Sequence, residues 1–294
     1  MNTEQRPLLM AVAAAALFSM VGLGWLARNL LMPPSNAGSR PSLLELLEEV
    51  RQAPSSPEVA APARRTPPRP PAARNWSTPL RASCPSVPAE LRDRLEARLA
   101  DLDRVATRLR IDPSNYGERY RRDAYGNPVD PTPRVIVLHE TVYGLSSAIN
   151  TFVTPHPRDD DQVSYHTLIG QKGEVVRALD PSQRAFGAGN SAFNGRWVVT
   201  NPRVGGSINN FALHLSLETP LDGEDEEQGH SGYTSAQYDA MAVVLADWMR
   251  RYSIPVDHIT THRHVDLAAA RADPRSFDWS QLQQRLLALG FSRC

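Results

Sequence analysis

The hydrophobic pattern changes along the chain, and its first part resembles a membrane segment. Residues 8–27 read LLMAVAAAALFSMVGLGWLA, about 20 residues without a charge, which is the length that crosses a bilayer core. Arg28 and further apolar residues follow, rather than the small-residue cleavage site of a secretory signal. We therefore expect an uncleaved signal anchor over residues 1–32, with secretion after signal cleavage as the alternative.

Residues 33–82 have the composition of a linker. Seven prolines stand between Ala53 and Ala73, interleaved with arginines, and such a stretch adopts an extended polyproline II conformation that buries nothing. At ~3.1 Å per residue where it is extended, it could hold a domain on the order of 100 Å from a membrane.

Residues 83–125 are expected to form a helical lead-in. Between Pro88 and Arg110, leucines recur near helical spacing, at positions 91, 95, 99, 102 and 109. This pattern predicts an amphipathic helix that either packs against the following domain or self-associates. We expect packing against the following domain, because a coiled coil needs more heptads.

From about residue 126 to residue 294 the pattern indicates a compact α/β domain. Short apolar runs at 135–139, 164–169 and 174–179 predict strands. The segment 212–218 alternates strictly, which places Leu213, Leu215 and Leu217 on one face and His214, Ser216 and Glu218 on the other.

Two helices are expected in the last third of the chain. Thr234 and Gln237 form a capping box, and the helix that they open directs a row of side chains inward: Tyr238, Met241, Leu245, Trp248 and Tyr252. The last predicted helix runs from about Trp279 to Leu289.

Charge and cysteine content narrow the functional classes. The 294 residues include 32 basic and 32 acidic side chains, so the chain lacks the basic footprint of a nucleic-acid partner. Cys84 and Cys294 are its two cysteines, which excludes a thiolate zinc cage. One disulfide or two free thiols are both compatible with the sequence.

Histidines in strand-like contexts are the candidate chemistry. Of eight histidines, His139, His166, His214 and His262 lie in or beside predicted strands, and Asp273 follows one loop later. A single histidine beside an apolar run is usually a hydrogen-bonded core residue. Two imidazoles and one carboxylate, however, leave zinc with an open fourth position, as in catalytic zinc sites.

Five motifs together resemble those of a known family. In the order of the chain they are Leu138-His139-Glu-Thr, Val163-Ser-Tyr-His-Thr-Leu-Ile with Gly173-Glu-Val, Ala185-Phe-Gly-Ala-Gly, Ile259-Thr-Thr-His262 and Ala272-Asp273-Pro-Arg-Ser-Phe-Asp-Trp279. The same order is seen in zinc-dependent N-acetylmuramoyl-L-alanine amidases of the type-2 family. That family includes the bacteriophage-lysozyme-type amidases and is similar to peptidoglycan recognition proteins. The resemblance covers about residues 134–289.

The resemblance implies a fold and a metal centre. It implies a central mixed β-sheet flanked by helices, over a domain that we place at residues 126–294. It makes His139, His262 and Asp273 the ligands of Zn²⁺, with His264 as a rival to His262. The implied reaction is hydrolysis of the amide between N-acetylmuramic acid and L-alanine in peptidoglycan or a muropeptide.

The resemblance also suggests roles for five further residues. Glu218 would be the general base, Arg271 would stabilise the tetrahedral oxyanion, and Tyr165 could donate a hydrogen bond to it. Phe186 and Asn190 would contact the substrate.

Three positions depart from the family pattern. Phe186-Gly187-Ala188-Gly189 stands where members commonly have Trp-His-Ala-Gly, so a substrate-contacting histidine is missing. Arg271 replaces a lysine, which keeps the charge and excludes proton exchange. Ser216 occupies the acidic position, and Glu218 lies two residues further on the same strand face.

These departures leave two alternatives open. The chain could be a catalytically inactive, membrane-tethered peptidoglycan-binding module, or a related zinc hydrolase that acts on another amide. For the enzyme we expect attachment to the inner membrane with the catalytic domain in the periplasm. In that compartment Cys84 and Cys294 could pair. The sequence leaves the oligomeric state open.

Overall fold

The computed structural model describes residues 66–70, 76–80, 86–224 and 229–291, all within the compact unit Pro62–Cys294. The predicted anchor, most of the predicted linker and both cysteines lie outside the described residues. Among the helices of the described residues, none combines the length and the apolar character of a membrane span.

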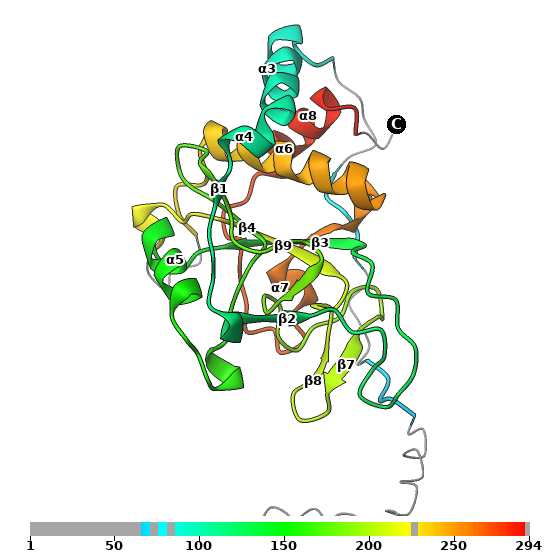
Figure 1. Ribbon diagram of the computed structural model, residues 1–294. Helices are drawn as coiled ribbons and strands as arrows, with labels where there is room; N and C mark the ends of the chain where they lie inside the picture. Colours follow the sequence, from blue (N-terminus) through cyan, green and yellow to red (C-terminus); the bar gives the residue numbers. More distant parts are fainter. Residues whose placement is uncertain (1–65, 71–75, 81–85, 225–228, 292–294) are drawn as a thin grey trace, which may run out of the picture. The chain divides into compact units, whose positions relative to one another are not determined.

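A six-stranded mixed sheet forms the centre of this unit, as predicted, in the order β1-β5-β4-β9-β3-β10 (Figure 1). The strand β3 (Val135–Glu140) lies between β9 (Ala212–Leu217) and the edge strand β10 (Ile259–Thr261), and it runs parallel to both. The strand β4 (Thr167–Ile169) is parallel to β9 and antiparallel to β5 (Val175–Arg177). The edge strand β1 (Thr107–Arg108) is parallel to β5.

Helices cover one face of the sheet. Figure 1 shows α3 (Ala89–Ala100), α4 (Leu102–Val105), α6 (Ser235–Tyr252) and α8 (Trp279–Ala288) together on that face. The short helix α7 (His262–Val265) lies on the opposite face, and α5 (Leu145–Val153) lies to one side. Two small two-stranded sheets complete the α7 side: β2 (Tyr116–Glu118) with β6 (Gln183–Ala185), and β7 (Val198–Asn201) with β8 (Gly205–Ser207).

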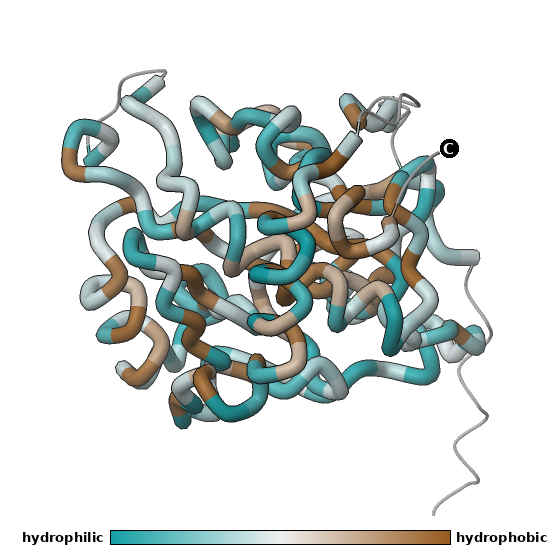
Figure 2. The backbone as a smooth tube through the Cα atoms, turned by 90° about the horizontal axis from the view of Figure 1, so that it is seen from above, coloured by the Kyte–Doolittle hydropathy of each residue, from teal (hydrophilic) through white to brown (hydrophobic). Residues whose placement is uncertain are grey.

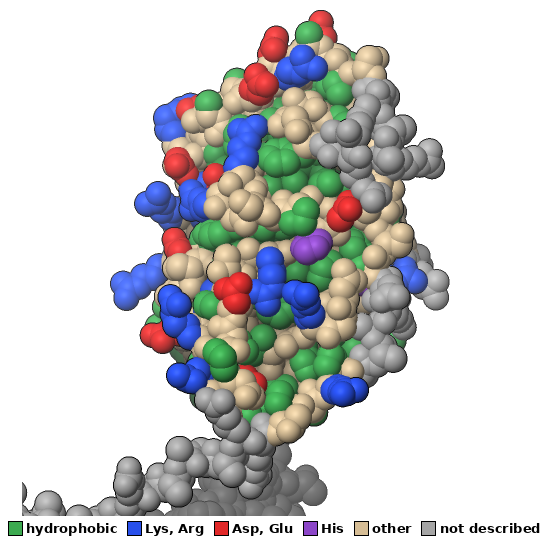
Figure 3. Space-filling model, turned by 90° about the vertical axis from the view of Figure 1, so that its right-hand side faces the viewer, with side chains coloured by type: hydrophobic (Ala, Val, Ile, Leu, Met, Phe, Trp, Pro, Cys, Tyr) green, Lys and Arg blue, Asp and Glu red, His purple; other side chains and the backbone are tan. Residues whose placement is uncertain are grey.

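The strands are buried on both faces because helices lie on one side and loops with α7 on the other. All six residues of β3 and of β9 are buried. Leu213, Leu215 and Leu217 pack with α6, whereas Ala212 packs with Val265 of α7 on the other face. The alternation predicted for this strand therefore separates two buried faces. Apolar segments accordingly concentrate in the interior (Figure 2), and charges of both signs are interspersed on the surface in Figure 3.

The capping box predicted for α6 is present. The Thr234 hydroxyl accepts a hydrogen bond from the Gln237 amide (3.1 Å), and the Gln237 side chain accepts one from the Thr234 amide (3.0 Å). Four of the five side chains predicted to point inward are buried, and Tyr252 is half-buried. The apolar stripe and the cap thus specify this helix locally.

The predicted lead-in packs against the domain, as expected, but it is not only helical. Leu91 and Leu95 of α3 are buried with the side chains of α6 and α8. The segment 83–125 also contains β1 and β2, which pair with strands of the domain.

Leu80 lies in the segment predicted as a linker, yet it is only 3% exposed and belongs to the main core. The linker was predicted from the composition of the whole segment, which does not indicate the burial of a single leucine.

Candidate metal centre

The carboxyl ends of β3 and β10 bring the two predicted histidine ligands together. His139 is the fifth residue of β3, and His262 begins α7 directly after β10. Because the two strands are parallel neighbours with Thr261 opposite Leu138, His139 and His262 follow this pair side by side. Alternation along β3 directs His139 to the face of α7, away from the large helices.

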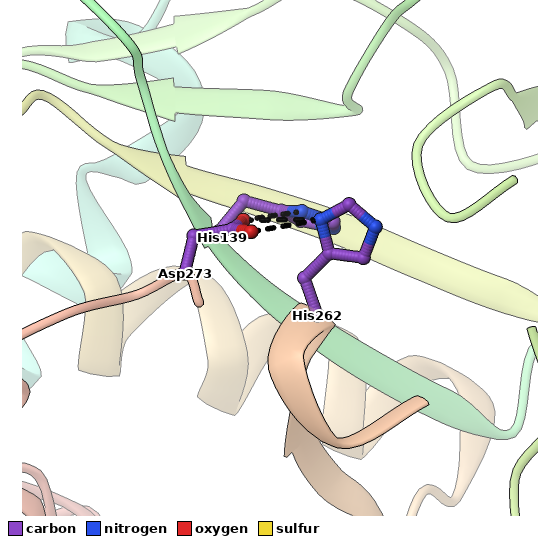
Figure 4. Close-up of side chains that lie close together, drawn as sticks. All are labelled: His139, His262 and Asp273. Atoms are coloured by element: carbon purple, nitrogen blue, oxygen red, sulfur yellow. Dashed lines mark hydrogen bonds and ion pairs between the residues drawn. The ribbon is translucent and has the colours of Figure 1, made fainter. Parts of the chain in front are cut away.

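Asp273 completes the group from the loop after α7 (Figure 4). Its Oδ2 lies 3.2 Å from Nδ1 of His139 and 3.1 Å from Nδ1 of His262, and its Oδ1 lies 3.0 Å from the latter. The Asp273 carbonyl accepts a hydrogen bond from the Arg263 amide (3.0 Å), which ties the loop to α7. Among the described residues, these three form the group that could hold a metal ion.

The donor atoms fit zinc. Tetrahedral ligands at about 2.0–2.1 Å from zinc lie about 3.3 Å apart, close to the observed nitrogen–oxygen separations of 3.0–3.2 Å. Two imidazoles and one carboxylate with a fourth position free form a donor set typical of catalytic zinc. The rival His264 instead packs its ring against Trp76, with ring centroids 4.6 Å apart.

The environment favours the protonation states that a metal requires. Burial lowers the pKa of His139 to about 4, although the hydrogen bond with Asp273 opposes this shift. Burial also opposes ionisation of Asp273, but the hydrogen bonds with His139 and His262 outweigh it and hold its pKa below the ordinary value. At neutral pH the site therefore contains a neutral His139 and an ionised carboxylate, as metal binding needs.

A third histidine, not predicted as part of this site, contacts His139. Nδ1 of His214 lies 2.9 Å from Nε2 of His139, and both side chains are fully buried. A Cβ atom on Gly187 would lie 2.6 Å from the same His214 nitrogen. The side chain missing from position 187 would therefore meet the His214 ring. The alternating pattern put His214 on this strand face, but the contact depends on the β3–β9 register.

Tyr165 contacts the metal-binding group directly, whereas Arg271 influences it through its charge. The Tyr165 ring stacks on His139, with centroids 4.3 Å apart and planes 24° apart. Burial, aided by the Asp273 charge, raises the pKa of the Tyr165 phenol, so it stays a hydrogen-bond donor. Arg271 is exposed, its amide donates to Asp266 (2.9 Å), and its charge helps to lower the pKa of His139.

Glu218, the predicted base, has other hydrogen-bond partners in the structure. Its Oε1 accepts from the Leu145 amide at the start of α5, and its Oε2 accepts from the Gln171 amide, both at 2.8 Å. The β9 residue paired with His139 is Ser216, whose hydroxyl is buried without a hydrogen-bond partner among the described residues. The structure therefore joins Glu218 to α5 and to the turn before β5, rather than to His139.

The two predicted substrate contacts lie in the segment that includes Gly187. The Phe186 ring lies under the Arg184 guanidinium, 5.0 Å from its centroid. Asn190 is exposed, and its carbonyl accepts from the Leu267 amide (3.2 Å) in the loop after α7.

A buried network that the sequence did not suggest fixes the loop of Asp273. Glu140 follows His139 on β3, and its carboxylate accepts from the Arg275 amide (3.0 Å) and guanidinium (2.5 Å). The Tyr233 hydroxyl donates to it (2.5 Å), and His230 lies 3.1 Å away. Because Arg275 lies two residues after Asp273, this network links one ligand-bearing element to the other.

The chain is similar to amidases that act on muramyl compounds. It is 31% identical over 123 residues to 1,6-anhydro-N-acetylmuramyl-L-alanine amidase AmpD of Citrobacter freundii, covering 42% of this chain and 56% of the relative. The AmpD of Escherichia coli K12 is 28% identical over 172 residues, covering 53% of this chain and 84% of the relative. The chain thus spans little more than half the length of the Citrobacter relative.

Solved structures of such amidases are also similar. A selenomethionine derivative of AmpD has a TM-score of 0.46 and 24% identity, covering 62% of this chain and 94% of the other. The amidase AmiD of E. coli, in complex with the substrate anhydro-N-acetylmuramic acid-L-Ala-D-γ-Glu-L-Lys, has a TM-score of 0.42 and 22% identity. That alignment covers 60% of this chain and 66% of AmiD.

The profile of one family matches residues 129–276, which is half of the chain and includes the three residues of the metal-binding group. The chain therefore belongs to the N-acetylmuramoyl-L-alanine amidase family.

Proposed function

We propose that this protein is a zinc-dependent hydrolase of the amide bond between N-acetylmuramic acid and L-alanine in muropeptides or peptidoglycan. The convergence of His139, His262 and Asp273 on one small volume carries the proposal. Family membership supports the reaction class, and the relatives named as muramyl-alanine amidases support the substrate class.

The residues around the metal-binding group would divide the work. Zinc, when bound, supplies a Lewis acid for the amide carbonyl and lowers the pKa of water towards ~7. The protonated Tyr165 phenol would donate a hydrogen bond to the tetrahedral oxyanion, and the permanent charge of Arg271 would stabilise it. Phe186 and Asn190 would contact the muramyl peptide.

The identity of the general base, which accepts the proton of the attacking water, needs an experiment. The sequence predicts Glu218, but its carboxylate would have to leave the Leu145 and Gln171 amides to reach a water beside His139. With Ser216 as the β9 partner of His139, no carboxylate stands at that position of the strand. This arrangement is what the alternative of an inactive binding module predicts, so the activity assay must be able to reveal binding without cleavage.

We further propose that the enzyme works in the cell envelope. Residues 8–27 would anchor it to the inner membrane, and the proline-rich segment would give the periplasmic domain reach towards the wall. Protease accessibility in intact cells tests this topology. If residues from 100 onward were found in the cytoplasm, the substrate would shift to recycled muropeptides.

A digestion assay tests the proposed reaction. The zinc-loaded chain is incubated with 1,6-anhydro-muropeptides and, separately, with intact sacculi, and the products are identified by mass spectrometry. We expect free stem peptides that begin with L-alanine, and none from the His139→Ala variant. Stoichiometric zinc and sacculus binding without any cleavage would refute the hydrolase and favour the binding module.

A further inference from the structure

The second ring nitrogen of His139 has a partner that the proposed function does not use. His139 presents Nδ1 to Asp273, at 3.2 Å, and Nε2 to Nδ1 of His214, at 2.9 Å. We propose that His214 is a positioning residue, which accepts a hydrogen bond from the His139 Nε2–H and so holds Nδ1 towards the metal position. The proposal rests on the zinc site described above and concerns how that site is held.

The proton positions follow from the contacts. A ligand nitrogen must offer a lone pair, so when a metal is bound to Nδ1 the proton of His139 sits on Nε2 and is donated to His214. Histidine ligands usually donate this second N–H to a carboxylate, a carbonyl or water, which fixes ring orientation. Here the acceptor is the imidazole of His214, whose Nδ1 lies 2.9 Å from the His139 Nε2.

The accepting nitrogen of His214 is fixed from two sides. His214 lies inside β9, where its amide donates to Nδ1 of His166 (3.0 Å), and the two imidazole rings stack with planes only 5° apart. Gly187 lies so close to the ring that a Cβ there would be 2.6 Å from Nδ1. Gly187 does not have a positive φ, so the close approach to His214, rather than backbone conformation, requires glycine.

Fold stability alone does not explain a histidine at this position. With Nδ1 accepting, the proton of His214 lies on Nε2, and this buried atom has no hydrogen-bond partner among the described residues. A buried N–H without a partner is unfavourable, so an apolar side chain of similar size would suit the metal-free core at least as well. The contact with His139 is what an apolar residue could not supply.

Two substitutions separate positioning from packing. His214→Leu removes the acceptor, whereas His214→Asn keeps an acceptor oxygen near the position of Nδ1. Competition with a chromophoric chelator should show zinc affinity reduced about 10- to 100-fold in His214→Leu, the usual effect of losing such a partner, with most of the affinity kept in His214→Asn. His258→Leu is the matched control, because its imidazole contacts the Arg134 carbonyl (2.8 Å) instead.

Metal-free measurements provide a second readout. Thermal unfolding of the metal-free His214→Leu variant should be close to that of the unchanged protein.

Gly187→Ala supplies an independent test, because it displaces His214 without replacing it and should also weaken zinc binding. Wild-type zinc affinity in both His214→Leu and Gly187→Ala would overturn the proposal. If His214→Leu does not fold, the other two variants still test the proposal. A positioning role requires His214→Asn to retain the zinc affinity that Gly187→Ala loses. Failure of the unchanged protein to bind zinc would instead overturn the proposed function.

Discussion

Replacing Glu218 by glutamine distinguishes a catalytic from a structural carboxylate. Both Glu218 oxygens accept backbone N–H groups at 2.8 Å, one of them at the first residue of α5. The N-cap residue of α5, Gly144, contributes no side-chain hydrogen bond, so Glu218 supplies this cap from another part of the chain. Glutamine keeps one acceptor and turns an NH₂ group towards the other amide.

The size of the effect follows from these contacts. A hydrogen bond to a charged group contributes ~1.5–3 kcal/mol, and the negative charge at a helix N-terminus adds ~0.3–1 kcal/mol. We therefore expect Glu218→Gln to lower the free energy of unfolding by about 2–4 kcal/mol. For a domain of this size that corresponds to a Tm decrease of about 4–16 °C.

The assay compares stability and turnover in the same zinc-loaded sample. With the structural role, kcat measured well below the lowered Tm should fall less than about tenfold. Loss of a general base would instead reduce kcat by ~10²-fold or more. Such a loss with an unchanged Tm would refute our reasoning and make Glu218 the base. Glu174→Gln is a suitable control, because the Glu174 carboxylate accepts a local amide from Lys172 (3.0 Å).

Three further predictions concern the site and its surroundings. His139→Ala should abolish stoichiometric zinc binding in metal analysis while His264→Ala keeps it, and the reverse result would reassign the ligands. Burial lowers the pKa of His166 to about 3, so below pH ~6.5 the unfolded chain binds a proton that the folded chain does not. The metal-free protein should therefore lose stability as the pH falls from 6.5, by up to ~1.4 kcal/mol per pH unit from this histidine. Urea unfolding at pH 7 and pH 5 measures this loss. A His166→Gln variant with the same pH dependence would contradict the assignment. Glu140→Gln should weaken zinc binding, because it loosens the Arg275 contact that holds the loop of Asp273, and an unchanged chelator competition curve would exclude that role.

Local patterns predicted the elements more completely than they predicted the contacts between elements. The apolar run of β3, the alternation of β9 and the capping box of α6 each depend on neighbouring residues, and all three are present in the structure. The three candidate ligands were named from motifs in a fixed order, and the structure brings them together.

What the sequence could not supply is register and long-range partnership. His139 contacts His214 because the β3–β9 register places Val137 opposite His214. A register shifted by one residue would turn His214 to the other face of the sheet, and no motif in the sequence specifies the register. Alternation predicted that Glu218 shares the strand face of Ser216, but β9 ends at Leu217 and the partners of Glu218 belong to α5 and to the turn before β5, far away in the chain. Leu80 was missed because composition describes a segment and burial concerns single side chains.

The pairing of β1 with β5 means that the unit that folds is larger than the unit that is homologous. The family match begins at residue 129, whereas β1 covers the outer edge of β5, and α3 covers apolar surface of α6 and α8 from residues 89–100. A fragment cut at the homology boundary would expose the backbone of β5 and that leucine-lined surface together, the combination that promotes pairing between chains. Expression of the domain should therefore start upstream of Leu80, and fragments that start at residue 129 should aggregate even though they contain every candidate ligand.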